Sequence, residues 1–108
     1  MTQFHHISVE QTRQMVEAGT AVVVDIRDEV SFQTAHIPHA RHFQNTPLQV
    51  LQDEVDATMP IIVTCYHGIS SQPAAQFFVE QGFETVYSMD GGFSHWQAMY
   101  PDFVESEH

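Results

Sequence analysis

The chain has 108 residues and a formal net charge of −11, and a length of this order predicts one domain over residues 1–108. The hydrophobic content of 43% is that of a globular protein, and no apolar run is long enough for a membrane span, which excludes a disordered or membrane-spanning chain. No lysine is present and the three arginines are scattered, so we predict no nucleic acid and no anionic membrane as partner.

The first elements predicted along the chain are a weak strand at residues 4–7 and a helix that follows Ser8. Ser8-Val-Glu-Gln11 has the form of a capping box, and Gly19 can end this helix. Residues 21–26 form a short, β-branched and continuously apolar run, which is typical of a strand buried on both faces of a parallel sheet. Two short helices and a weak strand are predicted next, at residues 29–35, 47–55 and 40–43.

The second half begins with another continuous apolar strand at residues 61–65. A helix then starts with Ser71 as its cap and Pro73 in its first turn, and it stops near Gly82. This helix is predicted to bury Ala74, Ala75, Phe77 and Phe78. A third strand at residues 84–89 and a last helix at 92–99 follow. Strands and helices therefore alternate, which predicts an α/β fold with a mainly parallel sheet of about five strands and helices on both faces.

In such sheets ligands bind at the carboxyl ends of the strands, and Cys65, the only cysteine, lies at one of these ends. A short loop around its sulfur would point N–H groups inward, Gly68 permits the tight conformation, and the next helix adds its positive end. A fall of about 2 units in the thiol pKa needs about 2.7 kcal/mol, and these groups act in that direction. Packing as a small buried hydrophobe is the alternative, but the strand–loop–helix junction favours a reactive cysteine.

Three segments of the chain carry recognisable motifs, namely Val24-Asp-Ile-Arg27 with Phe32 and His36-Ile-Pro-His-Ala40, the loop Cys65-Tyr-His-Gly-Ile-Ser-Ser71, and Asp90-Gly-Gly-Phe-Ser-His-Trp96. These segments resemble the rhodanese (thiosulfate sulfurtransferase) family in its stand-alone, single-domain bacterial form. They occur in the family's order and together span nearly the whole chain. The resemblance implies a rhodanese-like fold.

The resemblance also implies a catalytic role for Cys65 and a loop that cradles its sulfur, made of Tyr66, His67, Gly68, Ile69 and Ser70. Supporting positions in this interpretation are Ser71, Asp25, Arg27 and His36. The implied reaction is a double displacement. The cysteine takes the outer sulfur of thiosulfate as a persulfide, releases sulfite, and passes the sulfur to cyanide or to a dithiol acceptor such as a thioredoxin-like protein. No organic cofactor and no metal is implied.

The loop departs from several relatives because it contains no arginine or lysine, and only His67 can become cationic near neutral pH. A phosphatase loop of the form C-x5-R would need an arginine at position 71, which is serine, so we do not predict phosphatase activity. The alternative within the family is a protein-interaction or persulfide-carrier module with little thiosulfate activity.

Eight histidines raise the question of a metal site, above all His36, His39 and His42 and the pair His5-His6. Pro38 breaks any helical register across the first group, so we predict no metal. Phe93 and Trp96 are predicted to anchor the last helix in the core. The absence of a basic region followed by an apolar stretch at the N terminus and the lone cysteine predict a cytoplasmic protein.

Overall fold

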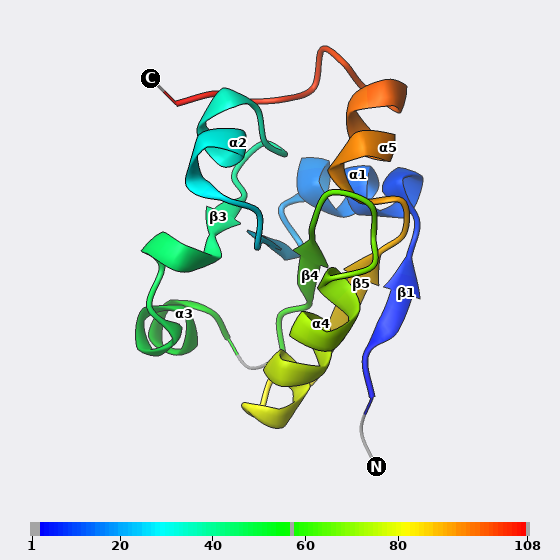
Figure 1. The fold of residues 1–108 in the computed structure, drawn as a ribbon. Helices are drawn as coiled ribbons and strands as arrows, with labels where there is room; N and C mark the ends of the chain where they lie inside the picture. Colours follow the sequence, from blue (N-terminus) through cyan, green and yellow to red (C-terminus); the bar gives the residue numbers. More distant parts are fainter. Residues whose placement is uncertain (1–2, 57, 108) are drawn as a thin grey trace.

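The computed structural model describes residues 3–56 and 58–107, and this part of the chain forms one five-stranded sheet (Figure 1). Every pair of neighbouring strands is parallel, and the strand order is β1-β5-β4-β2-β3. The strands are β1 (His5–Ile7), β2 (Val22–Asp25), β3 (Arg41–His42), β4 (Ile61–Thr64) and β5 (Val86–Met89). The predicted α/β fold with a parallel sheet is therefore confirmed.

The helices connect the strands as parallel pairing requires. They are α1 (Val9–Ala18), α2 (Glu29–Thr34), the 3-10 helix η1 (Phe43–Asn45), α3 (Leu48–Glu54), α4 (Ser71–Glu80) and α5 (Gly92–Met99). The predicted ends of α1 are confirmed. The Ser8 side chain accepts a hydrogen bond from the Gln11 N–H at 3.1 Å in a capping box, and Gly19 ends the helix at φ 69°.

Two apolar cores lie on opposite faces of the sheet, and β4 contributes to both because successive strand side chains alternate. Ile61 and Val63 pack into the core that α3 and α4 cover. Ile62 packs into the core that α1 and α5 cover, where Phe93 and Trp96 are buried as predicted. Helices thus cover both faces. None of the helices in the described residues is long and apolar enough to cross a membrane.

Two predictions about α4 are wrong. Ser71 does not cap the helix with its side chain; it is the first helical residue and is fully buried, with its hydroxyl 2.7 Å from that of Ser88. Phe77 is 38% exposed, because it lies about 200° around the helix from the buried Ala75. Val79, which the prediction did not include, is buried instead.

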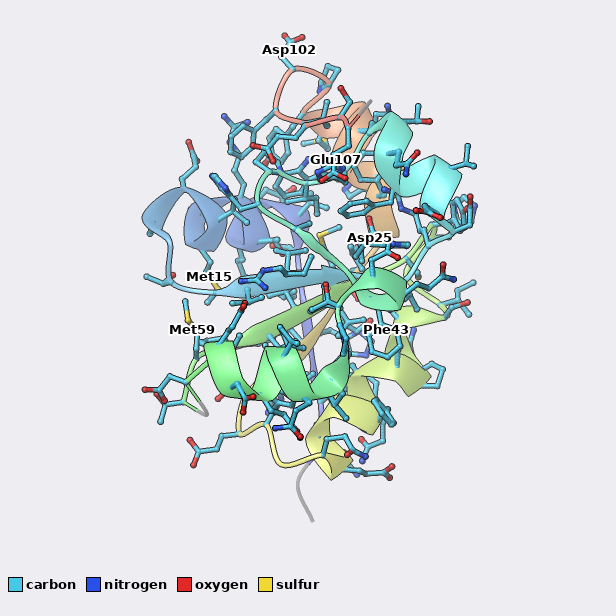
Figure 2. The ribbon with its side chains drawn as sticks, turned by 90° about the vertical axis from the view of Figure 1, so that its left-hand side faces the viewer. Met15, Asp25, Phe43, Met59, Asp102 and Glu107 are labelled. Carbon is cyan, nitrogen blue, oxygen red and sulfur yellow. The ribbon has the colours of Figure 1, made fainter. Side chains whose placement is uncertain are left out.

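The neighbouring strands β2 and β4 end level with each other at the carboxyl edge of the sheet, where Asp25 pairs in register with Thr64. Figure 2 shows Asp25 at this end of β2, near α2. Cys65 directly follows Thr64. The C-terminal segment passes over α2 (Figure 1), where the backbones of His36 and Glu105 exchange two hydrogen bonds of 2.8 Å. The fold therefore brings residues from both halves of the chain to the edge that carries the cysteine.

Candidate active site

The sulfur of Cys65 lies inside a loop of backbone N–H groups. It accepts hydrogen bonds from the N–H groups of Gly68 and Ser71, each with an N···Sγ distance of 3.2 Å. Only 4% of the residue is exposed. Ser71 is the first residue of α4, so the positive end of that helix supplies one of the two donors. This arrangement favours negative charge on the sulfur.

Two opposing effects set the acidity of this thiol. Burial raises the pKa of Cys65, because it disfavours the charged thiolate. The Ser71 hydroxyl and the N–H groups of Ser71, Gly68 and His67 near the sulfur lower it and outweigh burial, so that the pKa of Cys65 lies below the ordinary value of a thiol. Of these groups, the N–H groups of Ser71 and Gly68 hydrogen-bond the sulfur. A larger share of thiolate is therefore present at neutral pH than in an ordinary cysteine.

This acidity is measurable because the chain contains no other cysteine. We expect the thiolate absorbance in the ultraviolet to rise at a lower pH than that of an unperturbed thiol, with the Cys65→Ser protein as the blank. Ser71→Ala removes a hydroxyl that lowers the pKa of Cys65, so its midpoint should move to higher pH. A wild-type midpoint at or above that of a free thiol would contradict the expected stabilisation of the thiolate.

The loop residues differ in what they offer to the sulfur. Gly68 has φ +84°, and a Cβ there would lie 2.7 Å from the backbone nitrogen of Gly91, so the position needs glycine. The remaining predicted loop residues are exposed, namely Tyr66, His67, Ile69 and Ser70. The sulfur is thus held by backbone groups, and the side chains of the loop form the outer surface around it.

A glycine pair at the start of α5, Gly91 and Gly92, packs against the loop, a role that sequence reasoning missed. A Cβ on Gly92 would lie 2.5 Å from the carbonyl oxygen of Tyr66 and 2.6 Å from that of Cys65. This close approach lets Phe93 donate its N–H to the Cys65 carbonyl at 2.8 Å and Ser94 donate to the Tyr66 carbonyl at 3.0 Å. The signal in the sequence was the Gly-Gly pair itself.

Asp25 and Arg27 form a buried ion pair next to the loop. The Nε and Nη2 groups of Arg27 donate to the Asp25 carboxylate at 2.8–3.0 Å, and Nη2 also donates to the Ala35 carbonyl at 2.7 Å. The guanidinium lies 4.1 Å from the ring centre of Phe93 and 5.7 Å from that of Tyr66. The pair therefore connects β2 and the end of α2 with the start of α5 and with the loop.

The site geometry agrees with the comparison of the chain with known families. A family model described as a rhodanese-like domain matches residues 8–99. The chain belongs to the rhodanese-like family. The predicted resemblance is therefore confirmed, and the match includes β4, the cysteine that follows it and the glycine pair that packs against the loop.

One relative of this rhodanese domain is the thiosulfate sulfurtransferase GlpE of Pseudoalteromonas translucida (strain TAC 125). It is 48% identical over 94% of this chain and 97% of its own length. Among solved structures, the BH2092 protein of Bacillus halodurans has a TM-score of 0.75 at 22% identity, over 94% of this chain and 77% of the other. Yeast Ygr203w, described as a protein tyrosine phosphatase of the rhodanese family, has a TM-score of 0.76 at 16% identity, over 100% and 96%. Both structures show the shared fold.

Tyr66 ties the loop of the rhodanese domain to the N-terminal end of α2. Its hydroxyl lies 2.8 Å from the Ser31 hydroxyl and also bonds the carboxylate of Asp28. Asp28 is the cap of α2, where it accepts the Ser31 N–H at 3.1 Å. The hydrogen bonds from Ser31 lower the pKa of Asp28 and keep it ionised. Hydrogen bonds of its hydroxyl to α2 thus hold the Tyr66 side chain in place.

Two of the histidines that raised the question of a metal, His36 and His42, pack against Phe32 of α2. His36 is buried, stacks on Phe32 at 3.9 Å between ring centres, and has its Nδ1 2.6 Å from the Phe32 carbonyl oxygen. His42 stacks on the same ring, and its Nε2 lies 2.7 Å from the Arg27 carbonyl oxygen. The predicted supporting residue His36 thus bonds α2 rather than the loop. Among the residues that the structure describes, no three side chains group as metal ligands.

Proposed function

We propose that this protein is a thiosulfate sulfurtransferase in which Cys65 carries the transferred sulfur as a persulfide. The observation that carries the proposal is the sulfur of a lone cysteine held by two N–H donors, with a lowered pKa, in a rhodanese domain. A relative that shares 48% of its residues and nearly its full length bears the name thiosulfate sulfurtransferase. Cys65 is the catalytic residue, and residues 66–71 form the cradle of the sulfur.

In the first step the Cys65 thiolate attacks the outer sulfur of thiosulfate. A new S–S bond forms, the S–S bond of thiosulfate breaks, and sulfite leaves with the electron pair. The N–H groups of Gly68 and Ser71 stabilise the thiolate before the attack and can bond the terminal sulfur of the persulfide after it. Because only 4% of Cys65 is exposed, little water surrounds the thiolate, and the N–H groups take the place of that water.

In the second step an acceptor removes the outer sulfur and regenerates the Cys65 thiolate. Cyanide would take it as thiocyanate. A dithiol would take it as a persulfide, which its second thiol then resolves to a disulfide and hydrogen sulfide. A small dithiol or a thioredoxin-like protein in the cytoplasm fits this chemistry.

Ser71 stands where a phosphatase loop needs an arginine, and Arg27 is already paired with Asp25, so phosphoryl transfer lacks its cation.

Intact mass measurement tests this proposal directly. Incubation with thiosulfate should add the mass of one sulfur atom to the protein, and subsequent cyanide should remove it and release thiocyanate. Protein alkylated at Cys65 beforehand is the control and should gain no sulfur. A protein that stays unmodified with thiosulfate, although its cysteine is free and reduced, would contradict the proposed function and favour an interaction module.

A further inference from the structure

A hollow of about 260 Å³ lies beside the loop, between α2 and α5, and the mechanism above does not use it. Polar residues, among them Ser31, Ser94, Gln97, Tyr66 and Arg27, line it together with apolar ones. Figure 1 shows α2 and α5 on either side of the loop that follows β4. The hollow has room for roughly nine water-sized groups. Because Tyr66 lines the hollow and directly follows Cys65 in the chain, the hollow adjoins the loop that holds the nucleophile.

Arg27 offers this hollow an unused hydrogen-bond donor. Its Nε and Nη2 groups bond Asp25 and the Ala35 carbonyl, whereas Nη1 bonds no other residue within the described ranges. In those ranges no buried side-chain nitrogen or oxygen lacks a partner, so Nη1 is not sealed off from solvent. Arg27 is among the residues that line the hollow, and Nη1 is its guanidinium nitrogen that remains free for a ligand there.

We propose that the hollow is a subsite for the acceptor and binds the carboxylate of a small thiol acid. Nη1 of Arg27 and the hydroxyl of Ser94 would donate hydrogen bonds to that carboxylate, whereas the Ser31 hydroxyl already donates to Asp28. Asp25 offsets the charge of Arg27, and the ionised Asp28 bonds Ser31 and Tyr66 at the rim. The hollow therefore has no excess positive charge, and it disfavours the thiosulfate dianion more than a monoanion that Nη1 and Ser94 can hydrogen-bond. This inference rests on the proposed function.

The transfer step follows from this placement. With its carboxylate in the hollow, the acceptor turns its thiol toward Cys65 across Tyr66. The persulfide formed from thiosulfate is an anion, and its outer sulfur takes the proton of the acceptor thiol. The resulting thiolate attacks that sulfur, an S–S bond to the acceptor forms, and the S–S bond to Cys65 breaks. Cys65 leaves as the thiolate with the electron pair, and the proton stays on the outer sulfur of the acceptor persulfide. Atoms and charge balance without another reactant.

The test compares pairs of acceptors that have the same chain length but carry either a carboxylate or a neutral amide. Mercaptoacetate, mercaptopropionate and mercaptobutyrate are each paired with the corresponding neutral amide, and kcat/KM for sulfur transfer from the thiosulfate-loaded protein gives a carboxylate-to-amide ratio. Comparing this ratio between variants removes the intrinsic difference in thiol reactivity. Gln97→Glu places a negative charge at the rim and should lower the ratio about threefold, whereas Gln97→Arg should raise it by a similar factor.

Two controls distinguish binding in the hollow from a general effect of the protein's charge on anionic acceptors. Gln76→Glu makes the same charge change on α4, which covers the other face of the sheet, and should leave the ratio at the wild-type value. The kcat/KM for thiosulfate should change less with Gln97 than the ratio does. Arg27→Lys loses the planar guanidinium and should lower the ratio; if it does not fold, the Gln97 variants still decide.

A ratio that is equal in wild type, Gln97→Glu and Gln97→Arg would overturn the subsite, as would a change in thiosulfate kcat/KM as large as the change in the ratio. Neither result affects the proposed function, which the production of thiocyanate from thiosulfate and cyanide reports separately. Absence of thiocyanate in the wild type would instead overturn the proposed function, and the subsite with it.

Discussion

Cys65→Ser is expected to abolish sulfur transfer from thiosulfate while leaving the fold intact. A serine hydroxyl is far less acidic than a thiol, and the hydrogen bonds to this side chain within the described residues come from N–H donors and not from a base. The donors that stabilise the thiolate therefore cannot generate an alkoxide. We expect thiocyanate production to fall by at least about 10³-fold, to the level of a blank without protein.

A second variant at the same position checks the cradle as well as the nucleophile. In Cys65→Ser the oxygen can still accept from Gly68 and Ser71, but Cys65→Ala leaves both N–H groups without their acceptor. Both variants should be inactive, and the alanine protein should be less stable than the serine protein by about 1–3 kcal/mol in chemical denaturation. Residual thiosulfate-dependent transfer by either variant would show that another group carries the sulfur.

The elements with strong local signals were predictable from the sequence. The capping box at Ser8 and the left-handed Gly19 set the two ends of α1, and the β-branched runs that became β2 and β4 read as buried parallel strands. The cysteine at the end of the second run marked the site. These features depend on residues close together in the chain, which is why a sequence reveals them.

The misassigned Ser71 and Phe77 depend on contacts with distant segments. Ser71 has the residue type of a cap, but the loop directs its N–H to the Cys65 sulfur, and its hydroxyl packs against Ser88 of β5. Helix α4 has Ser70 rather than Ser71 at its N-cap position, and this shift of one residue does not explain why Phe77 is exposed. Phe77 stays exposed because the sheet contacts the opposite side of the helix, where Ala75 lies. Neither contact is visible in the local sequence.

The charge of the protein bears on how the site attracts anions. A formal charge of −11 repels thiosulfate, and the loop contains no arginine or lysine that would offset this repulsion. The favourable field at the sulfur comes instead from N–H groups of the loop and from the first turn of α4. Such a field acts over a short range, so it depends on the exact path of the backbone around Cys65. The residues that fix this path matter as much as the loop itself.

Gly92→Ala is expected to displace the backbone around Cys65 and to destabilise the protein, because the added methyl group meets the loop directly. At φ +62° an alanine is strained by about 1–2 kcal/mol. Its Cβ would also lie 2.5–2.6 Å from the carbonyl groups of Tyr66 and Cys65, which are backbone and cannot rotate away. Relieving that overlap costs about 1–3 kcal/mol more. We therefore expect the free energy of unfolding to fall by roughly 2–5 kcal/mol, a large part of the stability of a small domain.

Gly19→Ala is the matched control, because Gly19 has φ +69° but no atom within 4 Å of an added Cβ. It should show the strain alone, about 1–2 kcal/mol, with sulfur transfer kept. In Gly92→Ala the displaced carbonyls also weaken the hydrogen bonds from Phe93 and Ser94, so the loop moves relative to the sulfur. A shift of about 1 Å costs on the order of 100-fold in kcat/KM. Equal losses of stability and activity in the two variants would show that the glycine pair serves only the turn, because the contact with the loop is what distinguishes Gly92 from Gly19.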